Sequence, residues 1–76
     1  MDPKNSVRYQ LHKAMTQVAR NRAIVKERYE EYLADNNNRI DVHSMWLTGM
    51  IDAHTADLEV IRNMYNALGY EYEEAG

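Results

Sequence analysis

The side chains best placed for chemistry are two cations and a tyrosine in the first half of the chain. Arg22, Lys26 and Tyr29 follow one another at steps of four and three, so a helix would place them on one side. Cationic groups beside an aromatic ring can hold a phosphate and stack a base. We therefore expect these residues to bind a small anionic ligand or a protein partner. The alternative is a structural role, in which the cations pair with acidic residues of the second half or of a second subunit.

The histidines and carboxylates do not form a recognisable metal or catalytic motif. His54 and Asp57 are three residues apart and can share a side of a helix. However, the chain has neither the Glu-x-x-His pairs of di-iron bundles nor a His-Glu-x-x-His motif, and it has no cysteine. No nucleophile–base pair, phosphate loop or cofactor fingerprint is present either. We expect no metal, no cofactor and no catalytic residue, and hence a protein that is not an enzyme.

One stretch nevertheless suggests an enzyme as an alternative. The string ARNRAIVKERYEEYLADNNNRID, residues 19–41, resembles the long first helix and connecting loop of helical chorismate mutases, with an Arg and a later Lys. The resemblance covers about a third of the chain and implies a helical enzyme of that type. The Arg-Glu pair expected after the loop is replaced by DVHSMW, and the late Gln is missing, so the substrate-binding set is incomplete.

The composition limits the possible partners. The 76-residue chain carries a net charge of −3, which argues against DNA binding. It has no apolar run of the roughly 20 residues that span a bilayer, so we expect a soluble, cytoplasmic protein, in the host cytoplasm if it is phage-encoded. The charge is uneven, because residues 1–34 sum to +3 and residues 41–76 to −6. This asymmetry suggests charge complementarity between the halves or between subunits.

The order of helix-starting and helix-stopping residues predicts an all-α hairpin. Asp2 followed by Pro3 is a favourable helix start, and we expect a first helix over about 3–35. The run Asn36–Asn38 predicts a turn, since Asn tolerates the left-handed conformation. Asp41 then caps a second helix over about 42–68, which Gly69 ends. We assign residues 1–69 to one hairpin domain and 70–76 to an acidic tail, either frayed or docked on a basic neighbour.

Both predicted helices carry an apolar seam at alternating spacings of four and three, as in coiled coils. The first seam comprises Val7, Leu11, Ala14, Val18, Asn21, Val25, Arg28 and Tyr32. The second comprises Leu47, Ile51, His54, Leu58, Ile61, Tyr65 and Leu68. With the turn near Asn38, facing residues have numbers that add to about 76, and His54 then faces Asn21. We predict that this polar pair fixes the register, because sliding would leave both side chains in apolar surroundings.

A second apolar stripe on the later helix predicts self-association. Its members are Trp46, Met50, Ala53, Val60 and Met64, and the earlier helix adds Met15, Ala19, Tyr29 and Leu33. A hairpin of two helices has no interior to bury such a stripe. We expect a homo-oligomer, in the form of a four-helix bundle or a higher assembly, with the five residues of the later helix in its interface.

These features favour a small helical binding protein without catalytic activity. Small hairpins with this composition are typical of phage accessory proteins, and we expect one that inhibits a host factor or sequesters an anionic ligand. The alternative is a structural component of a virion or other complex.

Overall fold

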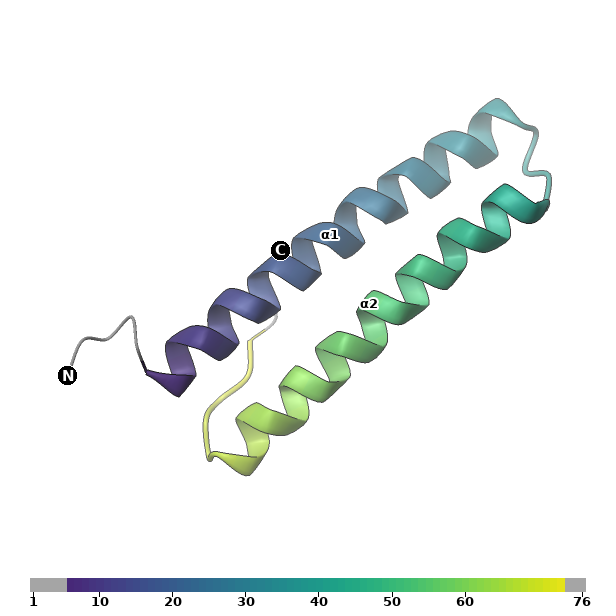
Figure 1. Ribbon diagram of the computed structural model, residues 1–76. Helices are drawn as coiled ribbons and strands as arrows, with labels where there is room; N and C mark the ends of the chain where they lie inside the picture. The colour runs from purple at the N-terminus through teal and green to yellow at the C-terminus, as the bar shows by residue number, and fades with distance from the viewer. Residues whose placement is uncertain (1–5, 74–76) are drawn as a thin grey trace.

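The computed structural model describes residues 6–73, which form two antiparallel helices packed side by side. Helix α1 spans Val7–Asp35 and helix α2 spans Val42–Ala67. Figure 1 shows the turn that joins them at one end, and the start of α1 beside the end of α2 at the other, which we call the open end. The predicted all-α hairpin is therefore confirmed. Neither described helix has a stretch that is long and apolar enough to cross a membrane.

The ends of α1 follow from side chains that replace missing backbone bonds. The Ser6 hydroxyl accepts a hydrogen bond from the Tyr9 amide and caps the first turn. The start expected at Asp2 and Pro3 lies outside the described residues. At the other end, Asn37 and Asn38 have φ of 54° and 59°, as the prediction of an Asn turn requires.

The ends of α2 lie where the sequence predicts them. Asp41 accepts a hydrogen bond from the Ser44 amide, while the Ser44 hydroxyl accepts one from the Asp41 amide, which makes a reciprocal cap. At the far end Gly69 has φ of 76°. The Tyr70 amide donates to the Tyr65 carbonyl at 2.9 Å, which closes the helix and reverses the chain.

The hairpin core confirms the predicted seam of α2 and corrects that of α1. Leu47, Leu58, Ile61 and Tyr65 are buried on α2. On α1, Val25 of the predicted seam is buried, but so are Met15 and Ala19, which the sequence assigns to the second stripe. Three members of the predicted seam, Val7, Ala14 and Arg28, are instead exposed. The face of α1 that meets α2 is thus turned toward Met15 and Ala19 in the half of α1 near the open end.

The segment after α2 explains part of this difference. Tyr70 and Tyr72 pack against the buried cluster that contains Met15 and Tyr65, and the Tyr72 and Tyr65 rings meet edge to face at 5.4 Å. The Arg8 guanidinium lies 5.6 Å from the centre of the Tyr70 ring. The described part of the tail is therefore docked beside a basic residue, which is one of the two expected alternatives. By covering one side of the seam, the tyrosines extend the core toward Met15.

Candidate functional site

The apolar stripe of α2, defined as Trp46, Met50, Ala53, Val60 and Met64, lies mostly in solvent. Trp46 is 59% exposed, Val60 54% and Met64 49%, Ala53 is exposed, and Met50 is half-buried. Trp46 and Met64 precede the buried Leu47 and Tyr65 by one residue, so they point about 100° away from α1. The stripe therefore runs along a flat side of the hairpin. Asp57 is the charged residue on the same line.

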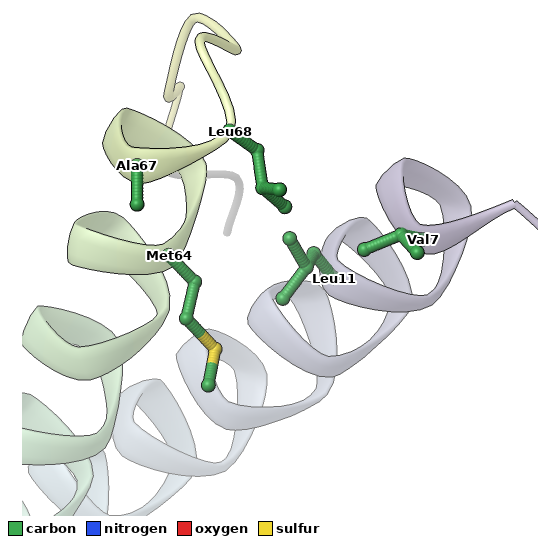
Figure 2. A pocket seen from close by; sticks show the side chains of 5 residues that line it. All are labelled: Val7, Leu11, Met64, Ala67 and Leu68. Carbon is green, nitrogen blue, oxygen red and sulfur yellow. The ribbon is translucent and has the colours of Figure 1, made fainter.

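An apolar pocket, which we call the end pocket, lies at the open end of the hairpin. It encloses about 340 Å³ and is lined by Val7, Leu11, Met64, Ala67 and Leu68. Figure 2 shows Leu68 pointing from the end of α2 toward Leu11 and Val7 of α1. Met64 belongs to both the pocket and the apolar stripe, so the two surfaces are continuous.

A polar and aromatic cluster occupies the turn end. The Tyr32 hydroxyl donates a hydrogen bond to the Asp41 carboxylate, which ties α1 to the cap of α2. This bond raises the pKa of Tyr32 and lowers the pKa of Asp41, and the Ser44 amide lowers the latter further. The His43 ring lies 4.6 Å from Tyr32 and 5.7 Å from Trp46, centre to centre. The exposed indole thus extends a row of three tilted aromatic rings.

Contacts at both ends of the hairpin indicate its register. Val7 and Leu68 line one pocket at the open end, and the Tyr32 ring lies against the His43 ring, tilted by 57°, near the turn. Both pairs have numbers that add to 75, close to the expected 76. Interpolation between them puts Asn21 level with His54. Both side chains are half-buried, and Asn21 accepts a hydrogen bond from Gln17 of its own helix at 3.1 Å. Direct contact of Asn21 with His54 stays a prediction.

The basic cluster lies in the middle of α1. Lys26 is exposed, while Arg22 and Tyr29 are half-buried toward the neighbouring helix. The three residues occupy two successive turns of one continuous helix, as their spacing predicts. This arrangement offers one exposed ammonium group beside a partly covered guanidinium and phenol. Within residues 6–73, no group of three or more His, Asp or Glu side chains is placed to hold a metal ion.

Comparisons with known proteins assign no relative. No protein-family model, no curated protein and no solved structure matches the chain significantly.

Sequence reasoning missed two features of these surfaces. The turn-end cluster joins Tyr32 to residues that lie beyond the turn, and the hydrophobic spacing of each helix carries no signal for it. The spacing within the first helix assigns Tyr32 to the seam, and the residue type of Asp41 indicates only a helix cap. The end pocket depends on where Leu68 meets α1, and the expected pairing of Leu68 with Val7 was the signal that could have located it.

Proposed function

We propose that the protein is a non-catalytic association module, a helical hairpin that binds a second copy of itself through the apolar stripe. The observation that carries this proposal is the exposure of Trp46, Val60 and Met64 along one side of α2. Large apolar side chains aligned on one face are typical of protein interaction sites. A single exposed residue of this kind would need no explanation, but three at helical spacing on one line do.

The small size of the core supports the same proposal. The main cluster of buried residues consists of Met15, Ala19, Leu58, Ile61 and Tyr65. Domains of this length seldom reach more than roughly 3–5 kcal/mol of net stability without a disulfide, a metal or oligomerisation. Since the chain has no cysteine, a second copy is the simplest source of further burial. Two hairpins stacked face to face would form a four-helix bundle.

Self-association is compatible with two biological roles. One is a structural component of a virion or other complex, in which the bundle is a building unit. The other is a phage-type accessory protein that inhibits a host factor, in which the bundle presents its remaining surface to the target. Both roles require the association step, and this step can be measured without knowledge of the partner.

Mass in solution tests the proposal. At micromolar concentration, sedimentation and light scattering should give a multiple of the 8.9 kDa chain mass. Val60→Glu should reduce the mass to that of one chain, because it buries a charge in the interface. Thr55→Glu is the matched control, since Thr55 is exposed on the opposite side of the same helix. A wild-type monomer at all accessible concentrations would contradict self-association.

A second candidate function is the capture of a small anion by Arg22, Lys26 and Tyr29. The observation that favours it is the exposed Lys26 beside the half-buried Arg22 and Tyr29. Nucleotides titrated against the wild type should bind, and Lys26→Glu should abolish binding with fold and mass unchanged. Lys13→Glu, at an exposed position on the same helix, is the control. Equal binding by wild type and Lys26→Glu, or none by either, removes this candidate.

A further inference from the structure

We infer that two copies pair through antiparallel α2 helices, with Trp46 of each copy inserted into the end pocket of the other. This inference rests on the proposed self-association and specifies its geometry. It follows from the positions of two features, the protruding side chain of Trp46 and the end pocket, which lie on the same side of α2.

Trp46 and the end pocket are on the same side of α2. Trp46 and Met64 are 18 residues apart, which is five turns of an α-helix and a distance of about 27 Å. They therefore point in the same direction from opposite ends of α2. Trp46 is 59% exposed near the turn, while the pocket lined by Met64, Ala67 and Leu68 lies at the open end. Figure 2 shows these pocket side chains at the end of α2, across from α1.

A two-fold axis exchanges these two features. When α2 lies antiparallel to its copy with Trp46 opposite residues 64–68, the copy's own Trp46 meets the first pocket at the same time. Such an arrangement is closed, since the same patch serves both subunits. Its axis passes near residue 56, midway between Trp46 and residue 66. Ala53 lies exposed on the stripe in this stretch and allows the two helix backbones to approach closely.

The chemistry of the pocket suits an indole ring. All five lining residues are apolar, and the volume of about 340 Å³ is within the range that small-molecule pockets occupy. Burial of an aromatic ring removes on the order of 150–250 Å² from water, and the pairing buries two of them. The pocket is open on one side, so the indole N–H can stay at its rim, in contact with water.

The dimensions of the hairpin accommodate this interface. The described molecule measures 53 × 20 × 16 Å, and the stripe lies on one of its broad sides. A broad side of this size exceeds the roughly 800 Å² that each partner contributes to a standard interface. The main competing arrangement stacks α2 on α1 of the second copy, where opposite charges meet. In that arrangement Trp46 meets α1 of the second copy, and the end pocket receives no tryptophan.

Cysteine cross-linking distinguishes the two arrangements, because the natural chain has no cysteine. In the inferred dimer, Asp57→Cys on the stripe places two thiols beside the axis, offset by two residues or about 3 Å, and they should form a disulfide on mild oxidation. Ala53→Cys is the matched control, an exposed position on the same face. Its two copies would be offset by six residues, or about 9 Å along the axis, beyond the usual Cα separation of a disulfide. Covalent dimer should therefore form on the order of ten times faster from Asp57→Cys than from Ala53→Cys.

Tryptophan emission gives a second measurement on the unmodified chain. The single Trp46 should shift to the blue as concentration rises through dimer formation, and Ala67→Glu in the pocket should abolish that shift. A dimer by mass in which Asp57→Cys cross-links no faster than Ala53→Cys would overturn this pairing while leaving self-association intact. A chain that remains monomeric would instead overturn the proposed function, and the pairing with it.

Discussion

At the scale of single residues, the contact between Tyr32 and Asp41 links three parts of the fold. Asp41 caps α2 through the Ser44 amide and accepts a second hydrogen bond from the Tyr32 hydroxyl of α1. One carboxylate thus starts α2 and holds it against the last turns of α1. Both hydrogen bonds favour the ionised carboxylate, so the stability of the turn end depends on its charge.

Acidification should weaken the hairpin through Asp41. Its pKa in the fold is below the ordinary value of 3.8, so its contribution to stability is present above that pH and is lost as the pH falls through the lowered pKa. Tyr32→Phe removes the main cause of the shift. The drop in Tm between pH 7 and pH 2.5, followed by circular dichroism, should be smaller in Tyr32→Phe than in the wild type. Tyr9→Phe, at an exposed position of α1, should match the wild type, and an unchanged drop in Tyr32→Phe would refute this linkage.

The corrected core leads to a second residue-scale prediction. Met15 is 1% exposed, whereas Met45 is 64% exposed. Met15→Ala should lower the free energy of unfolding by about 2–5 kcal/mol, because it removes buried methylenes and leaves a cavity. Met45→Ala should change it by less than about 0.5 kcal/mol. Urea titrations of the two variants give both changes in the free energy of unfolding. Equal losses in the two variants would contradict the burial of Met15 and would favour the seam of α1 that the sequence predicts.

At the scale of elements, the chain reversal after α2 is the main structural feature besides the two helices. Gly69 has a positive φ, which lets the chain turn back so that Tyr70 and Tyr72 reach the core. By contrast, Gly49 lies within α2, and an added Cβ there would meet no atom within 4 Å. The two glycines therefore have opposite energetic roles.

Replacing each glycine by alanine tests this difference. Gly69→Ala should destabilise the protein by about 1–2 kcal/mol, since a residue with a Cβ resists the left-handed conformation. Gly49→Ala should stabilise it by roughly 0.5–1 kcal/mol, because alanine loses less backbone entropy in a helix. Thermal melts at one low concentration compare the two variants with the wild type. A loss of stability in Gly49→Ala would mean that Gly49 has a packing role in an assembly.

Most of the elements could be predicted from the sequence, because their signals are local. The Asn36–Asn38 turn, the Asp41 cap and the stop at Gly69 each depend on one residue type and its preferred backbone conformation. The buried face of α2 followed its spacing, since its apolar residues are large and regularly placed. The face of α1 could not be chosen in the same way. Both of its candidate lines are largely apolar, the expected seam through three valines and the other through Met15, Ala19, Tyr29 and Leu33. The choice between them depends on Tyr70 and Tyr72, which lie more than 50 residues away from Met15 and Ala19.

The candidate site was predictable to a similar extent. The apolar stripe of α2 is visible in the sequence as a spacing of seven between Trp46, Ala53 and Val60, flanked by Met50 and Met64, and the structure leaves most of it exposed. The end pocket and the Tyr32–Asp41 contact depend on how α1 and α2 are aligned along their axes. The spacing of residues within each helix does not determine this alignment. The basic cluster lies on one continuous helix as expected, and its role stays a prediction.

At the scale of the whole molecule, the hairpin is a rod with an uneven charge. Across the described helices, α1 carries a cationic stretch from Arg8 to Arg28, while the acids Asp52, Asp57 and Glu59 lie in the middle of α2. Pairing of two α2 helices would bring the two copies of Asp57 close to the symmetry axis. The inferred dimer therefore contains one repulsive contact at its centre, which limits its affinity.

Removing this charge should strengthen the dimer. Asp57→Asn should lower the dissociation constant roughly tenfold, which corresponds to about 1.4 kcal/mol of relieved repulsion. Added salt should tighten the wild-type dimer and have little effect on the variant, because screening acts on the same repulsion. Sedimentation equilibrium at two salt concentrations measures both effects. Asp52→Asn, away from the stripe, is the control, and weaker association of Asp57→Asn would indicate that Asp57 meets a cation of the second copy.

The start of α1 and the end of α2 lie side by side at the open end, and this arrangement determines how the hairpin responds to a mechanical load. A pull applied at these two helix ends would separate α1 and α2 from the open end toward the turn, so contacts would break one after another. The docked Tyr70 and Tyr72 are the first contacts that such a force would meet, and the bond from Tyr32 to Asp41 is among the last. In an assembly that is stretched through these ends, each hairpin would serve as an extensible link that opens at low force and recloses from its turn.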